Sequence, residues 1–235
     1  MARIELRQVS VRFPVYYAGT RSLLRKIWRR EWLDREAGDR PMHRVALHEV
    51  DATVAAGETV LLCGPGGGGK LTLLRVMGAV LPVVSGQVDI QARRIGCIFA
   101  PALYHRRQSV RDTVVLEGLR YGLSLATARE KLGAILDIAG LELEPAQHAA
   151  SLAASELLKL TVACAVEFGC DLLLIGSAIE SVEAAFLLRI ATALRAADPE
   201  SILVVETTDN KLLPPLDARL IVVENGRLTP AQRQP

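Results

Sequence analysis

The chain has 235 residues, of which 50% are hydrophobic and 23% charged, and its formal net charge is +2. This is enough apolar sequence for one packed domain, and the near-neutral charge gives no indication of nucleic acid, so no nucleic-acid partner is expected. No run approaches the ~18 apolar residues of a membrane span, and the start, MARIELRQVS, lacks the apolar region of a secretion signal, which predicts a cytoplasmic protein.

The four cysteines and four histidines give no indication of a metal site. The cysteines lie in apolar contexts at spacings that match no metal-binding pattern, and the histidines show no close clustering. We therefore expect buried free thiols and no bound metal.

The N-terminal part begins with two short alternating segments, residues 3–6 and 9–13, which predict strands. A segment of different composition follows at residues 14–43. Its cationic side chains are Arg21, Arg25, Lys26, Arg29 and Arg30. Apolar residues, Trp28 among them, lie between these charges at helical spacing. Such a basic amphipathic helix can face a membrane or a permease, and the alternative of an ordinary solvated helix packed on its own domain stays open.

An apolar strand at residues 59–63 leads into GPGGGGKLT, residues 64–72. The phosphate-binding pattern G-x-x-x-x-G-K-[ST] is matched at Gly64, Gly69 and Lys70, but Leu71 replaces the hydroxyl residue that coordinates magnesium. Thr72 comes one residue late, about 100° further round the helix, and cannot simply take over.

Two interpretations of this loop remain open. The residues that predict weak phosphate binding without magnesium are Gly64, Gly66, Gly67, Gly68, Gly69, Lys70 and Thr72. Glycine N–H groups form a concave nest for an anion, and the lysine adds positive charge. Alternatively, the loop is empty and keeps its glycines because the turn requires them.

The remaining elements alternate between strands and helices. Strands are predicted at 85–90, 93–99, 171–176 and 201–207, helices within 109–140, 151–167 and 181–196, and a C-terminal hairpin around Asn225-Gly226. This alternation predicts an α/β fold with a mostly parallel, helix-covered sheet.

Several of these segments resemble an ABC-type ATPase subunit. The matching stretches are ALHEVDATVAAGETV, SGQVDI, RIGCIFAPALYHRRQSVRDTVVLEGLRYGLS, DLLLIG and RLIVVENGRL. The resemblance implies a P-loop NTPase-type ABC nucleotide-binding domain over residues 1–235. That domain has an antiparallel β subdomain beside the core sheet and a helical subdomain at 105–165. The basic insertion at 14–43 resembles the subset that drives polysaccharide export.

The functional motifs of that family are altered wherever the resemblance places them. Its LSGGQ sequence, which contacts the partner's nucleotide, falls on Ala153, Ala154, Ser155 and Glu156 after Leu152. The other departures are Gly176 for the magnesium-binding Asp, Ser177 for the catalytic Glu, Thr207 for the switch His, Ala100 for the loop Gln, Val45 for the adenine-stacking aromatic and Leu71 in the phosphate loop. Neither glycine nor serine can hold the metal or polarise the attacking water.

The resemblance therefore implies a degenerate subunit with no catalytic residue. It would bind ATP or ADP weakly or not at all, without magnesium, and Thr72 would contact the α-phosphate. Its partners would be a transmembrane permease and either a second, competent ATPase subunit or a second copy of itself, at the inner face of the plasma membrane. Two alternatives stay open. One is a working ATPase with rearranged ligands, for which Glu180, Glu183 and Glu206 are the available carboxylates; the other is a freestanding pseudo-ATPase scaffold.

Overall fold

The computed structural model describes residues 2–15, 42–99, 108–208 and 216–230. The predicted membrane-facing side chains from Arg21 to Arg30, and Ala100, lie outside these ranges. The strands are β1 (Arg3–Val15), β2 (Met42–Val54), β3 (Thr59–Cys63), β4 (Ser85–Gln91), β5 (Ile95–Ile98), β6 (Leu172–Ile175), β7 (Ile202–Glu206), β8 (Arg219–Glu224) and β9 (Arg227–Pro230). The helices are α2 (Lys70–Met77), α3 (Val110–Arg120), α4 (Leu125–Glu130), α5 (Leu132–Ala139), α6 (Ala154–Glu167) and α7 (Ala184–Ala197), with short 3-10 turns η2 (Ala149–Ser151) and η3 (Ser177–Ser181).

The core is a six-stranded sheet in the order β5-β6-β7-β3-β8-β9. All its neighbouring strands run parallel except the β8–β9 hairpin at one edge. Every residue of β3, β6 and β7 is buried, as expected for apolar strands that are covered on both faces. The predicted α/β fold with a mostly parallel, helix-covered sheet is therefore confirmed.

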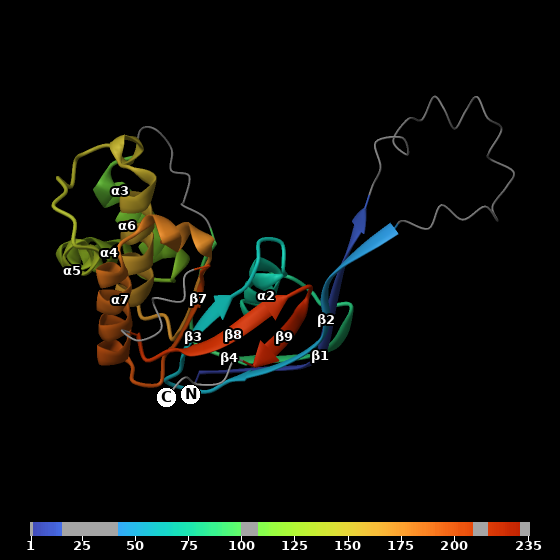
Figure 1. Ribbon diagram of the computed structural model, residues 1–235. Coiled ribbons are helices and arrows are strands. Elements are labelled where there is room, and N and C mark those ends of the chain that lie inside the picture. Colours follow the sequence, from blue (N-terminus) through green and yellow to red (C-terminus); the bar gives the residue numbers. More distant parts are fainter. Residues whose placement is uncertain (1, 16–41, 100–107, 209–215, 231–235) are drawn as a thin grey trace, which may run out of the picture.

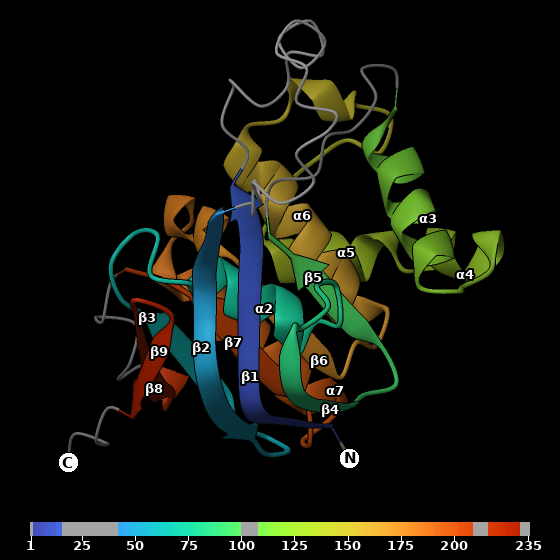
Figure 2. The ribbon, with the colours of Figure 1, turned by 90° about the vertical axis from the view of Figure 1, so that its right-hand side faces the viewer.

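Two layers cover the core sheet. On one face, α2 lies between the core sheet and a three-stranded antiparallel sheet in the order β2-β1-β4 (Figure 2). On the other face, α6 and α7 pack on the sheet, and these two helices gather with α3, α4 and α5 into one lobe (Figure 1). The parallel strands therefore all end at the same edge, between these layers.

The β1–β2 pair extends further than the sequence predicted. Pro14 pairs with His43 and Val15 with Met42, so the two ends of the predicted insertion 14–43 belong to the antiparallel ladder. The described chain stops at this pair, and the hairpin projects away from the body of the molecule (Figure 1).

The helical lobe has its own small core, formed by residues of α3, α5 and α6 together with Phe168. The stretch predicted as helical over 109–140 is three helices. The first ends at Arg120, with Tyr121 as its C-cap residue, because Gly122 takes a φ of 77°. Helix α6 begins at Ala154 and not at 151, where η2 precedes it. No helix in the described part of the chain is long and apolar enough to cross a membrane.

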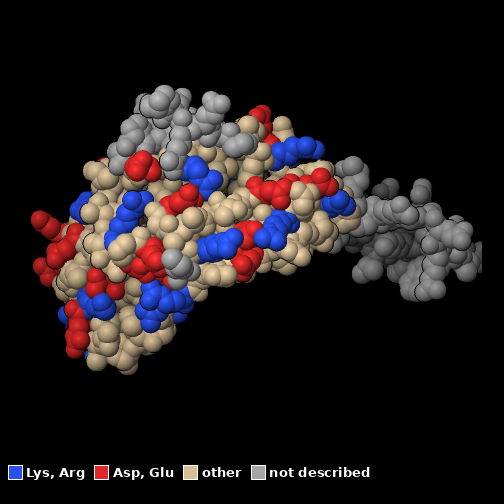
Figure 3. All heavy atoms as spheres, turned by 90° about the horizontal axis from the view of Figure 1, so that it is seen from below, with Lys and Arg blue, Asp and Glu red and all other residues tan. Residues whose placement is uncertain are grey.

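Charges are mixed on the face seen in Figure 3, where acidic and basic side chains are interspersed. On β1, for example, the carboxylate of Glu5 pairs with Arg3 at 2.7 Å and also with Arg7. This face therefore carries no patch of a single sign that would favour a nucleic acid.

Candidate nucleotide-binding site

The glycine-rich loop connects the end of β3 to α2 at the edge where the parallel strands end. It is held by close backbone packing: Gly226 N donates to Gly68 O at 2.9 Å, which joins the loop to the β8–β9 turn. A Cβ on Gly64 would lie 2.2 Å from Val223 O, and one on Gly68 would lie 2.6 Å from the same oxygen. These two glycines are required by packing, whether or not a nucleotide binds.

Gly66 and Gly67 differ from them. A Cβ on Gly66 would meet nothing within 4 Å, and one on Gly67 would meet only the Arg44 guanidinium, at 3.6 Å. Both residues are exposed, so this part of the loop presents backbone to solvent. Gly67 takes a φ of 75°, which favours glycine whether or not a ligand binds. At Gly66 neither packing nor a positive φ requires glycine, so the backbone there is open to close approach by a ligand.

Lys70, the first residue of α2, is only 5% exposed. Its Nζ donates to Gly64 O at 2.7 Å and to Pro65 O at 3.1 Å, so the ammonium group lies along the inside of the loop. Leu71 and Thr72 follow on the helix, and both are half-buried. A cation beside glycine N–H groups at a helix N-terminus is an arrangement that binds phosphate.

The edge beside the loop lacks the groups that would hold magnesium. Gly176, directly after β6, is buried, and a Cβ there would lie 3.0 Å from Phe99 O. Ser177 is exposed and begins η3, while Thr207, after β7, has no exposed surface. Among the described residues, no group of three or more His, Cys, Asp or Glu could hold a metal. The donors present fit a phosphate group and do not fit a hydrated magnesium ion.

Among the described residues, Glu206 is a buried carboxylate at this edge. It ends β7, is 7% exposed, and accepts a hydrogen bond from the Ser177 backbone N–H. Its Oε2 atom has no hydrogen-bond partner. Burial raises the pKa of Glu206, and the attraction of Lys70 and the Ser177 hydrogen bond offset this only in part.

The other two acids considered from the sequence are engaged elsewhere. Glu180 Oε1 accepts from the backbone N–H of Thr208 at 2.7 Å and from its hydroxyl at 2.9 Å. Glu183 pairs with Lys159 of α6 at 2.7 Å, and this contact lowers the pKa of Glu183. Glu180 thus connects η3 to the residues after β7, and Glu183 connects the start of α7 to α6.

The LSGGQ-like position lies at the start of α6. Ala153 is the N-cap residue, and its backbone N–H donates to Glu156 Oε2 at 2.8 Å. Ala153 and Ala154 are exposed, whereas Ser155 is half-buried. The helix N-terminus already has an anion from its own chain, so a phosphate brought here by a partner would meet a carboxylate.

The residue at the position where the resemblance expects an adenine-stacking aromatic, Val45, lies on β2. Val45 is 44% exposed and follows Arg44, whose guanidinium lies beside Gly67. Sequence reasoning missed Arg44, because nothing in the chain around residue 44 shows that β2 passes the mouth of the loop. An exposed cation there adds positive charge where an anionic ligand would enter.

Comparison with known proteins agrees with this geometry. The family described as "ABC transporter" matches residues 47–176, which span the loop, the helical lobe and β6. One relative is the aliphatic sulfonates import ATP-binding protein SsuB 2 of Frankia alni, 29% identical over 78% of this chain and 73% of its own length. Another is the phosphate import ATP-binding protein PstB 2 of Natronomonas pharaonis, 28% identical over 79% of this chain and 74% of its own length.

The fold is also that of a solved ATP-binding cassette. The dimeric post-hydrolysis structure of MJ0796, bound to ADP and Pi, superimposes with a TM-score of 0.73 at 18% sequence identity, over 96% of both chains. At this identity the likeness concerns the fold.

Proposed function

This chain belongs to the ABC transporter family, and we propose that within it the chain is a degenerate nucleotide-binding subunit, which binds a nucleotide weakly through its loop and does not hydrolyse it. The subunit would act as a structural or regulatory partner of a permease and of a competent ATPase subunit, or of a second copy of itself.

The observation that carries this proposal is the composition of the edge beside the loop. Leu71 puts an isobutyl group where a hydroxyl would bind the metal, and Gly176 and Ser177 provide no carboxylate. Lys70 and the glycine N–H groups can still bind phosphates, but among the described residues Gly176 and Ser177 offer no carboxylate to orient and deprotonate water. When bound, magnesium would neutralise charge on the phosphates, and the residues that would hold it are missing.

Transport of a polysaccharide, and a place at the inner face of the membrane, belong to the same proposal. They are supported by the basic amphipathic segment within 14–43, whereas the relatives above are named for the import of sulfonates and phosphate. The cationic side chains of this segment would contact anionic lipid or a permease. Each Lys or Arg near an anionic membrane surface contributes ~1 kcal/mol of favourable binding free energy.

The first experiment measures phosphate release by the purified chain with magnesium and ATP. We expect no more than background, and the same rate for Lys70→Ala. Magnesium-dependent release that disappears in Lys70→Ala would overturn the proposal.

The second experiment tests the membrane partner. Because Val15 and Met42 are paired across the ladder, a short flexible linker can replace residues 18–41 without opening the hairpin. We expect this variant to fold cooperatively and to be recovered less in the membrane fraction when the permease is present. Equal recovery of the two proteins would reject the membrane part of the proposal.

A working ATPase with rearranged ligands is the second candidate, and Glu206 is the observation that favours it. The carboxylate lies at the correct edge of the sheet, one strand away from Gly176. Turnover that is lost in both Glu206→Gln and Lys70→Ala would identify this candidate.

A further inference from the structure

Glu206 lies between the strand that leads into the loop and the strand that leads to Gly176. In the parallel ladders, Leu62 of β3 pairs with Glu206, and Ile175 of β6 pairs with Val205. The sheet is therefore continuous across β3, β7 and β6 at the position of Glu206, and β7 contacts α2.

Strand alternation fixes the face on which the Glu206 side chain lies. Ile202 and Val204 belong to the core cluster that contains α2, and Val205 belongs to the cluster on the opposite face. Glu206, two residues after Val204, is on the α2 face. The carboxylate is therefore on the same side of the sheet as Lys70.

Each of these two charges is buried and incompletely bonded. Lys70 is 5% exposed, and its ammonium group donates to two neutral carbonyls, those of Gly64 and Pro65. Glu206 is 7% exposed, and its Oε2 atom lacks a hydrogen-bond partner. A buried charge is costly unless an opposite charge compensates it. The charged side chains that act on Glu206 are Lys70 from α2, which attracts it, and Glu180 from η3, which repels it.

The phosphates of a nucleotide would bind near both of these side chains, Lys70 and Glu206. In a loop of this type the backbone N–H groups hold the α- and β-phosphates, and the lysine reaches the β- and γ-phosphates. A terminal third phosphate extends past Lys70 toward the strand ends, which is where the Glu206 carboxylate lies.

We propose that Glu206 is a built-in counter-charge of Lys70 that makes this loop select a nucleoside diphosphate over a nucleoside triphosphate, independently of magnesium. This inference rests on the proposed function, since it requires that the loop binds a nucleotide. The third phosphate would compete with the carboxylate for Lys70 and be repelled by it, whereas a diphosphate ends at the loop.

A metal-ligand role for Glu206 is the competing explanation. A magnesium site draws on several oxygen donors, and the neighbouring positions here are Leu71 and Gly176, while Glu180 is bound to Thr208. Glu206 therefore has Lys70 among its charged surroundings and too few oxygen donors beside it for a metal site.

The test measures binding of ADP and of ATP to the full chain by calorimetry, once with magnesium and once with a chelator. For the native protein we expect ADP to bind about tenfold more tightly than ATP under both conditions, which corresponds to a difference of about 1.4 kcal/mol in binding free energy. Glu206→Gln keeps the shape and the acceptor for Ser177 N–H, and it should bring the two affinities within about twofold.

Glu180→Gln is the matched control, because it removes a nearby negative charge outside the buried pair. It should keep most of the native preference for ADP. Glu206→Thr, which suits a strand end, is the second variant if Glu206→Gln does not fold.

Three results would overturn the inference: the same ADP-to-ATP ratio in the native and Glu206 variant proteins, tighter ATP binding that requires both magnesium and Glu206, or no binding of either nucleotide to either protein. The proposed function fails on a different measurement, magnesium-dependent phosphate release, so the two failures are distinguishable.

Discussion

Two carboxylates, Asp171 and Glu206, are buried to a similar degree at opposite ends of the parallel strands. They differ in how completely their oxygens are hydrogen-bonded. Asp171, directly before β6, is 3% exposed and accepts from Arg93 N and Arg94 N, both at 2.8 Å, and from Arg93 Nε at 3.2 Å. Glu206, at the end of β7, has one backbone donor and an oxygen with no partner.

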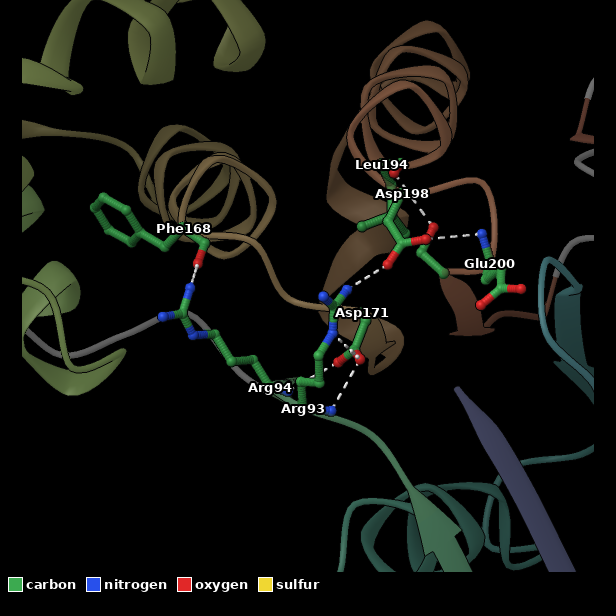
Figure 4. Close-up of polar contacts among 8 residues, drawn as sticks. Arg93, Arg94, Phe168, Asp171, Leu194, Asp198 and Glu200 are labelled. Carbon is green, nitrogen blue, oxygen red and sulfur yellow. Dashed lines mark hydrogen bonds and ion pairs between the residues drawn. The ribbon is translucent and has the colours of Figure 1, made fainter. Parts of the chain in front are cut away.

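The surroundings of Asp171 form a connected network (Figure 4). Arg93 also reaches Asp198, at the end of α7, and Arg94 donates to Phe168 O at 2.7 Å, after α6. Burial by itself would raise the pKa of Asp171, but the hydrogen bonds from Arg94 and Arg93 outweigh it, and the pKa is lowered. At Glu206 burial prevails and the pKa is raised.

We propose that the difference separates an edge that holds the fold together from an edge that binds a ligand. Fully bonded buried charges stabilise the native state, whereas under-bonded ones occur where the site has another task. The variants below test this division, from the largest expected effect to the smallest.

Asp171→Asn should lower the free energy of unfolding by about 3 kcal/mol, because an amide cannot accept all the bonds that the carboxylate accepts and Arg93 loses its buried partner. Urea unfolding at neutral pH measures it. Because the pKa is lowered in the folded state, the stability that Asp171 contributes is present above its unfolded pKa and is lost as the pH falls through the folded value. Asp198→Asn, at a more exposed end of the network, is the control; an equal loss there would contradict this role for Asp171.

Gly64→Ala should cost about 2 kcal/mol, since Gly64 has a φ of 134° and its Cβ would collide with Val223 O. Gly66→Ala should stay within about 0.5 kcal/mol, because it points into open space. If the open glycines serve a ligand, Gly66→Ala should nevertheless weaken ADP binding. Thermal unfolding with and without ADP gives both quantities, and an unchanged ADP shift would assign Gly66 to the turn alone.

Glu206→Gln should change the free energy of unfolding in the opposite direction from Asp171→Asn. We expect it to raise this free energy by about 1 kcal/mol near neutral pH. The fold binds a proton at Glu206 more tightly than the unfolded chain does. The native protein's stability is therefore greatest below the unfolded pKa of this group and falls as the pH rises through the folded pKa. The extra stability of the variant over the native protein should grow between the unfolded pKa and the folded pKa of Glu206, and it should vanish at lower pH. A loss of stability at all pH values would show that Glu206 holds the fold as Asp171 does.

The sequence predicts those features of the two edges that neighbouring residues encode, and it does not predict contacts between residues far apart in the chain. The apolar strands, the glycine loop and the helices are set by local pattern, and the sequence shows directly that positions 176 and 177 carry no carboxylate. The partners of Asp171 come from Arg93 and Arg94, 78 and 77 residues away, and no local pattern records that pairing. The burial of Glu206 can be predicted from the sequence, because strand alternation after Ile202 and Val204 places its side chain on a buried face. What the chain alone does not show is that α2 brings Lys70 over that face.

Ser177→Glu should have the smallest effect of all. The site is exposed at the start of η3, so stability should change by no more than about 0.5 kcal/mol. Phosphate release should stay at background. A carboxylate at 177 can polarise water only if a metal-bound triphosphate lies beside it, and Leu71, Gly176 and Glu206 all still oppose that ligand. Adding Leu71→Ser should not rescue turnover either, because groups that act as a unit give little when restored singly. If the single variant did hydrolyse ATP with magnesium, the metal would have ligands other than those described, and this edge would be a resting catalytic site.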